Sequence, residues 1–125
     1  MDVTPLIPAG RKVIDAYGDG GFRVSGERFI GSILLFPDRV LPWSARDFAE
    51  LDRDSLAPFV GMTPPVEILL IGCGARMEFV SPALRRELRG LGLVIDAMDT
   101  GAACRTYNVL LAEERRVAAA LIAVK

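Results

Sequence analysis

Residues 66–74 read VEILLIGCG, a short apolar run that ends in a glycine-rich turn. Valine, isoleucine and leucine dominate the run, and its length suits a strand better than a helix. Gly72 and Gly74 allow backbone conformations and close approaches that a side chain would obstruct. The stretch therefore predicts a buried strand that leads into a glycine loop.

The next residues along the chain predict a helix and a second strand. Ser81 is a favourable N-cap, Pro82 suits the first helical position, and leucines recur at helical spacing until Gly92. Residues 93–98, LVIDAM, form another apolar run. A strand, helix and strand in this order are typical of a right-handed parallel crossover, so we expect a sheet that is at least partly parallel.

A second helix and a last strand complete this unit. Asp99 is suited to cap a helix, and residues 117–124 form the near-continuous apolar run expected of a strand that is covered on both faces. Thr106 and Asn108 flank the core side of the helix, and we expect them to hydrogen bond to neighbouring backbone. Helical spacing places these residues on the core side: Thr100, Ala103, Cys104, Tyr107, Leu110 and Leu111.

The preceding half of the chain predicts an antiparallel β extension. Residues 1–12 contain prolines and a glycine without periodicity, so we expect a flexible N-terminal arm. Residues 13–17 and 22–25 flank a glycine-dense turn, which favours a hairpin of two antiparallel strands. A third strand is expected over residues 32–36, and residues 28–31 lead into it.

Two short helical turns are expected after these strands. Ser44 and Asp47 match a capping box, and Trp43 with Phe48 occupies the two positions of a hydrophobic staple. We interpret Trp43 as a structural residue that fixes the entry of the chain into the helix. The Asp-Ser pair at residues 54–55 is suited to cap a further turn.

Composition narrows the class of protein. At 125 residues, with 51% hydrophobic residues and a net charge of −1, the chain suits one domain, residues 13–125, and lacks the basic excess of a nucleic-acid binder. No apolar run approaches the roughly 20 residues of a membrane span, and no signal peptide is recognisable. Two cysteines fit a reducing compartment. We therefore expect a soluble, cytoplasmic protein that binds no nucleic acid.

The chain contains no histidine. This excludes the Ser-His-Asp and Cys-His arrangements and removes the commonest metal ligand. We therefore predict no catalytic residues, no metal ion and no cofactor.

Several segments carry a resemblance to a known family. The sequence resembles a widespread domain family of unknown biochemical activity whose mitochondrial members are assembly factors for respiratory complex I. The resemblance implies a compact α/β domain with a central mixed sheet that acts as a protein-binding module, in mitochondria for the eukaryotic relatives. It extends over residues 13–123 and is carried by residues 21–24 (GFRV), 31–34 (GSIL), Trp43, 70–74 (LIGCG), 98–110 (MDTGAACRTYNVL) and 114–121 (ERRVAAAL).

A ligand site at the glycine loop is one hypothesis. Parallel strands bring the loop and the second helix start to the same edge, where open α/β sheets favour ligands, and free backbone N–H groups there could hold a small anion. We favour the alternative that the glycines only form a tight turn and that Asp99 is only a cap, because its charge would repel an anion. The candidate ligand-binding residues are Gly72, Cys73, Gly74, Arg76, Asp99, Thr100 and Gly101.

The two cysteines pose a separate choice. Cys73 and Cys104 could meet at this edge as a redox pair, but neither belongs to a Cys-x-x-Cys motif and Cys104 falls on the core side of its helix. We therefore favour two structural thiols, of which Cys73 in the loop is the more accessible.

The second helix also predicts a partner surface. Ala102, Val109 and Ala112 lie roughly opposite Tyr107, with Arg105 among them, so a small apolar strip is expected to face outward. An alanine or two on a solvated face is the alternative explanation.

The sequence as a whole predicts a three-layer α/β domain with a central mixed sheet, a C-terminal βαβαβ unit and an N-terminal antiparallel β extension. The predicted function is non-enzymatic binding of protein partners, for which the resemblance implies respiratory complex I subunits or a second assembly factor. Binding of a small ligand or anion is the alternative, and the sequence leaves homo-oligomerisation open.

Overall fold

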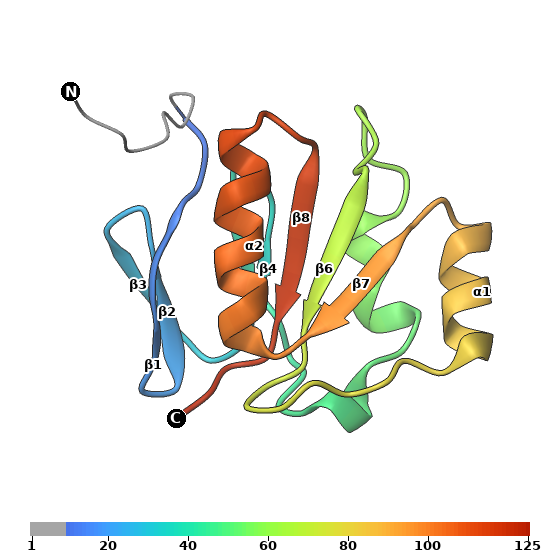
Figure 1. The fold of residues 1–125 in the computed structure, drawn as a ribbon, viewed down its shortest axis with the longest axis horizontal. Coiled ribbons are helices and arrows are strands. Elements are labelled where there is room, and N and C mark those ends of the chain that lie inside the picture. The colour runs from blue at the N-terminus through green and yellow to red at the C-terminus, as the bar shows by residue number, and fades with distance from the viewer. Residues whose placement is uncertain (1–9) are drawn as a thin grey trace.

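The computed structural model describes residues 10–125 and contains two β-sheets with helices on both faces of the larger one (Figure 1). The smaller sheet is antiparallel and consists of β1 (Ile14–Gly18), β2 (Gly21–Val24) and β3 (Glu27–Ile30). The larger sheet has the order β5-β4-β8-β6-β7, formed by β4 (Ile33–Leu35), β5 (Val40–Pro42), β6 (Ile68–Gly72), β7 (Ile95–Met98) and β8 (Val117–Leu121).

The larger sheet is mixed, as predicted. β6 pairs in parallel with both β7 and β8, whereas β4 is antiparallel to β8 and to β5. Every residue of β8 is buried, which explains why the sequence of this central strand is apolar without alternation. The predicted parallel crossover from residues 66–71 to 93–98 is confirmed.

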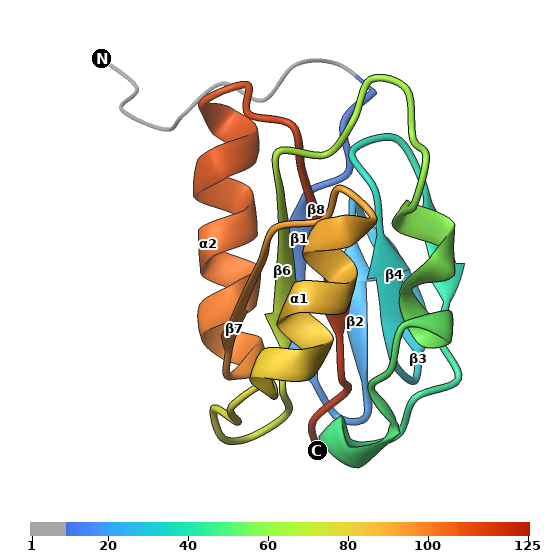
Figure 2. The same cartoon turned by 90° about the vertical axis from the view of Figure 1, so that its right-hand side faces the viewer.

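Helices cover the two faces of this sheet (Figure 2). One face packs against α2 (Thr100–Ala112) and the three-stranded sheet. The other packs against α1 (Pro82–Gly90) and the 3₁₀ helices η1 (Phe48–Glu50) and η2 (Asp54–Phe59). Because strand side chains alternate between the faces, the two faces belong to separate core clusters, and the three-layer prediction is confirmed.

The predicted helix caps of the C-terminal unit are present. The Ser81 hydroxyl accepts a hydrogen bond from the backbone N–H of Leu84, and Pro82 is the first residue of α1. Asp99 caps α2, and the buried residues of that helix match the predicted core side with two differences: Leu110 is only partly buried, and Gly101 is buried although it was not predicted to be.

The N-terminal hairpin is also present, and the strand predicted over residues 32–36 is present as β4, but an additional strand, β3, lies between them. β1 and β2 are joined through Asp19 and Gly20, both with positive φ, as a tight turn of this handedness requires. The segment at 28–31, predicted only to lead into a strand, itself contains most of β3. Gly31 has a positive φ and turns the chain from β3 in one sheet to β4 in the other.

The predicted capping residues before η1 and η2 are wrong. Asp47 caps η1 by accepting from the N–H of Ala49, whereas Ser44 is exposed and lies before the turn. Before η2, Asp52 accepts from the N–H of Ser55, and no side chain caps the turn at its first residue. A short strand, β5, occupies the apolar residues before Trp43.

Trp43 has the structural role predicted for it. Its side chain is buried in the core cluster on the α1 side of the sheet, and its indole N–H donates to the carbonyl oxygen of Ser55 at 3.1 Å. The hydrogen bond ties β5 to η2, as expected of a buried tryptophan whose polar end needs a partner.

The predicted N-terminal arm lies mostly outside the described residues. Within residues 10–12, the backbone N–H of Lys12 donates to Pro37 and its carbonyl accepts from the hydroxyl of Tyr107. Among the described residues, no helix combines the length and apolar character that crossing a membrane requires.

Candidate functional site

The glycine loop and the start of α2 meet at the carboxyl edge of the parallel strands, as the sequence predicted. The backbone N–H of Cys73 donates to Met98, and that of Thr100 donates to Gly74, each at 2.8 Å. The Thr100 hydroxyl accepts from the N–H of Gly74 at 2.9 Å and donates to the carbonyl of Ile122 at 2.7 Å. One buried side chain thus links the glycine loop, α2 and the end of β8.

In the same contacts, backbone N–H groups that could otherwise bind an anion already donate hydrogen bonds within the chain. The N–H groups of Thr100 and Gly74 are paired within the chain, and the N–H of Ala102 donates to Asp99 at 2.9 Å. At Gly101, an added Cβ would lie 2.3 Å from the hydroxyl oxygen of Tyr17, so this side chain covers the helix start. The geometry therefore does not favour the anion-binding alternative.

Gly72 serves packing rather than ligand approach. A Cβ at this position would lie 2.9 Å from Leu121 and 3.0 Å from the Thr100 hydroxyl, both within the domain. Arg76, the only arginine among the candidates at this edge, is exposed. The turn-and-cap interpretation explains all of these contacts without a ligand.

The two cysteines are free and lie in different core clusters. Cys73 packs with the α1 side of the sheet, and Cys104 with the α2 side. Burial raises the pKa of the Cys73 thiol, and it raises that of Cys104 to about 12. Because the sheet separates the thiols and both resist ionisation, the redox-pair hypothesis is wrong.

Hydrogen-bonding side chains beside the core of α2 hold the β extension. The Asn108 amide donates to the carbonyl of Ile14 and accepts from its N–H, in the manner of a neighbouring strand. This confirms the predicted backbone contact of Asn108. Thr106 instead donates to the sulfur of Met98, which sequence reasoning missed.

The outward strip of α2 contains one strongly exposed apolar residue. Val109 is 55% exposed and Arg105 is exposed, whereas Ala102 and Ala112 are half-buried. Val94, just before β7, is 52% exposed. We call the outward face of α2 formed by Ala102, Arg105, Val109 and Ala112 the α2 surface.

β7 continues the α2 surface. Asp96 pairs in register with Leu70, whose side chain packs under α2, so Asp96 lies on the same face of the sheet. Asp96 is exposed and Met98 is half-buried. Figure 1 shows no helix over β7 on this face.

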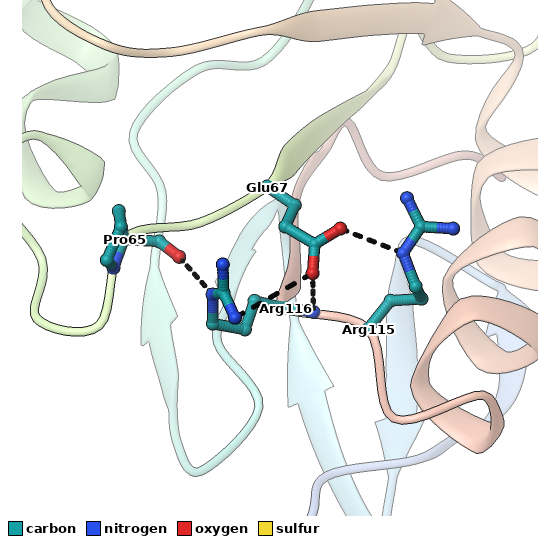
Figure 3. A network of polar contacts seen from close by, with 4 residues as sticks. All are labelled: Pro65, Glu67, Arg115 and Arg116. Atoms are coloured by element: carbon teal, nitrogen blue, oxygen red, sulfur yellow. Dashed lines mark hydrogen bonds and ion pairs between the residues drawn. The ribbon is translucent and has the colours of Figure 1, made fainter.

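At the end of the sheet opposite the glycine loop, where β6 and β8 begin, lies an ionic network that sequence reasoning also missed (Figure 3). The Glu67 carboxylate accepts from Arg115 Nε at 2.8 Å, and Arg116 Nε donates to the carbonyl of Pro65 at 2.8 Å. The hydrogen bond from Arg115, followed by that from the Arg116 backbone, holds the pKa of Glu67 below its usual range. These contacts hold the start of β6 beside the start of β8.

These features define a class of protein. The described residues form an α/β fold with a mixed sheet, and none of their buried side-chain nitrogens or oxygens lacks a hydrogen-bond partner. The chain belongs to the family described as "Protein of unknown function (DUF498/DUF598)", which matches residues 14–122.

Two relatives place the chain within this family. It is 34% identical over 109 residues to NADH dehydrogenase [ubiquinone] 1 alpha subcomplex assembly factor 3 of Xenopus tropicalis; the match covers 87% of this chain and 60% of the frog protein. It is 39% identical to an uncharacterised protein of Rhodobacter capsulatus over 91% of this chain and 86% of that protein. The chain thus spans about three fifths of the frog relative's length.

A solved structure confirms the fold. An outer membrane protein from Bartonella henselae, 38% identical, superposes with a TM-score of 0.84 over 96% of this chain and 100% of that chain. The similarity spans the three-stranded extension as well as the mixed sheet.

Proposed function

We propose that this chain is a non-enzymatic protein-interaction module that assists assembly of respiratory complex I or another membrane-associated complex from the cytoplasmic side. The observation that carries the proposal is the exposed Val109 on the α2 surface, in a chain whose named relatives are assembly factors. Subunits of that complex or a second assembly factor are the proposed partners.

The shape and chemistry of the α2 surface support contact with a protein. Ala102 and Ala112 are small, so a partner can approach the helix backbone closely. Val109 between them offers apolar area whose removal from water favours association. Arg105 lies at the margin, and arginine is enriched in protein interfaces relative to the rest of the protein surface.

Replacement of Val109 by glutamate tests the proposal. We expect Val109→Glu to fold, because its side chain points away from the core, and to recover fewer NADH dehydrogenase subunits from native extract in affinity purification with mass spectrometry. Ile30→Glu is the matched control, since Ile30 is an apolar residue that is 79% exposed on β3, outside the α2 surface.

Thermal melting, measured in parallel, shows whether each variant is still folded. Loss of the subunits by Val109→Glu alone, with normal melting, supports the proposal. Equal recovery with both variants contradicts the assignment of the α2 surface. Recovery of no NADH dehydrogenase subunit with the unaltered chain contradicts the role in complex I assembly, and recovery of no subunit of any membrane-associated complex contradicts the assembly role itself.

A further inference from the structure

A cleft of about 200 Å³ opens at the edge of the sheet opposite the glycine loop, where β6 and β8 begin. Its apolar part includes Val117, which is fully buried, and Val66 and Met62, which are half-buried. Three prolines contribute to its walls, and their fixed φ angles limit how far these walls move: Pro37, Pro64 and Pro65.

The charges around this cleft are unbalanced. Arg11, Arg39 and Arg116 line it, and among residues 10–125 Asp38 is the one acidic residue in its lining. The Asp38 carboxylate lies 3.4 Å from Arg39, and Glu67, outside the lining, lies 3.9 Å from Arg116 and 2.8 Å from Arg115, so these two carboxylates offset only part of the charge of the arginines. An anion that enters the cleft meets a net positive charge.

Two of the arginines are held in place by contacts with other residues of the domain. The guanidinium of Arg39 lies 3.9 Å from the centre of the Phe36 ring, a stacking contact that fixes its plane. Arg116 donates to the carbonyl of Pro65 and lies 3.9 Å from Glu67 (Figure 3). Because these side chains are already ordered, binding an anion costs less conformational entropy than it would on free arginines.

The volume of the cleft limits the size of its ligand. Pockets for drug-sized ligands begin at about 300 Å³, so this cleft is too small for a nucleotide. It is large enough for one phosphate or carboxylate group with a short apolar substituent. Planar guanidinium groups match both kinds of anion in geometry.

We propose that the cleft bounded by Arg11, Arg39 and Arg116 binds a small organic anion. Its phosphate or carboxylate group contacts the arginines, and its apolar group covers Val66 and Met62. This site is independent of the α2 surface and of any assembly role.

An NMR titration of the ¹⁵N-labelled chain at low salt tests the site. The probes are inorganic phosphate, phenyl phosphate and benzoate. We expect saturable shifts of the backbone amides of Arg39, Val66 and Val117, without shifts of Gly74 and Ala102 at the other edge. Tighter binding of phenyl phosphate than of benzoate assigns the anionic group as phosphate, and the reverse order assigns it as carboxylate.

Variants of the lining residues establish whether the arginines act as proposed. Arg39→Gln and Arg11→Gln are each expected to weaken binding about tenfold, the value of one charge-assisted hydrogen bond. Asp38→Asn is expected to tighten it, because the negative charge beside Arg39 is removed. Arg86→Gln, which changes an exposed arginine of α1, is the control and is expected to leave binding unchanged.

Three results would overturn the proposal. One is the absence of a saturable shift with any probe. Another is equal weakening by Arg86→Gln and the cleft variants, which would indicate general charge attraction. The third is saturable binding that moves only amides outside the cleft.

Discussion

Thr100 is the residue on which the carboxyl edge of the sheet depends most. Its side chain is fully buried. Its hydroxyl accepts a hydrogen bond from the glycine loop and donates one to the residue after β8, so the two segments are connected without a ligand. A buried hydroxyl with both roles satisfied is a stable part of a core, because neither polar partner is left without a hydrogen bond. The interpretation of this edge as structural rests on that one side chain.

Asp99, beside it, is predicted to stabilise α2 without any catalytic role. Asp99→Ala removes the hydrogen bond to the N–H of Ala102 and should lower the free energy of unfolding by about 1 kcal/mol, the typical value of an N-cap. Chemical denaturation measures this change. Asp96→Ala is the control, because Asp96 is exposed on β7 outside the cap, and an unchanged midpoint for Asp99→Ala would show that the cap contributes nothing.

The cysteines are predicted to react slowly and unequally with thiol reagents. Only the thiolate reacts, and both pKa values are raised, so at neutral pH each folded-state thiol is protonated. Cys73, at 6% exposure, is expected to react faster than Cys104, at 3% and with a pKa of about 12. Reaction rates of Cys73→Ser and Cys104→Ser with a chromogenic disulfide, measured as pH rises, check this. Equal rates in the two variants would contradict it.

At the scale of elements, the Glu67 network makes the pairing of β6 and β8 depend on pH. The pKa of Glu67 is lowered from its ordinary value of 4.5 in the folded state, so the carboxylate stabilises the fold above that pH. The stabilisation is lost as pH falls through the folded-state pKa. We therefore expect Glu67→Gln to be less stable than the unaltered chain at pH 7 and equally stable in strong acid.

Unfolding in denaturant between about pH 7 and pH 3 measures this dependence. Because Glu67 is exposed, added salt should shrink the difference between the two chains. A constant difference across the whole pH range would show that the network stabilises by packing and not by charge.

The contact of β6 with α2 predicts that Gly72 tolerates no side chain. Gly72→Ala places a methyl group against Leu121 and Thr100 and should cost about 1–3 kcal/mol, as overpacking of a core does. Gly90→Ala is the matched control, since an added Cβ there meets nothing within 4 Å. Thermal melting distinguishes them, and equal melting temperatures would mean that the start of α2 moves to accommodate the methyl group.

The success of sequence reasoning differed between elements for physical reasons. The unit from β6 to β8 could be predicted because its apolar periods, caps and glycines all agree. β3 and β4 could not be separated, because Gly31 moves the chain from one sheet to another and no local pattern encodes which strands pair. The cap at Asp47 was missed because Ser44 also matches a capping pattern, and the local sequence does not decide between the two residues.

At the scale of the whole molecule, long-range contacts limited the prediction of sites. The sequence correctly placed the glycine loop beside the start of α2. It contains no sign that Tyr17, far along the chain, covers Gly101, or that Glu67 pairs with Arg115. These contacts decide which backbone donors and which arginines remain available, so the choice between a ligand site and a structural edge required the fold.

The molecule presents two separate surfaces once the glycine loop is set aside. The α2 surface is apolar with a polar margin, and the arginine-lined cleft lies where β6 and β8 begin. We propose the α2 surface as a contact for a protein partner and the cleft as a separate site for a small anion.

Site-specific photo-crosslinking in cells tests the interaction claim most directly. A photoreactive amino acid is placed at position 109, and at position 30 as the control, and the crosslinked products are identified by mass spectrometry. We expect a crosslink from position 109, but not from position 30, to an NADH dehydrogenase subunit or to a second assembly factor. Crosslinks from position 30 alone, or none from position 109 in a folded chain, would contradict the proposed interaction.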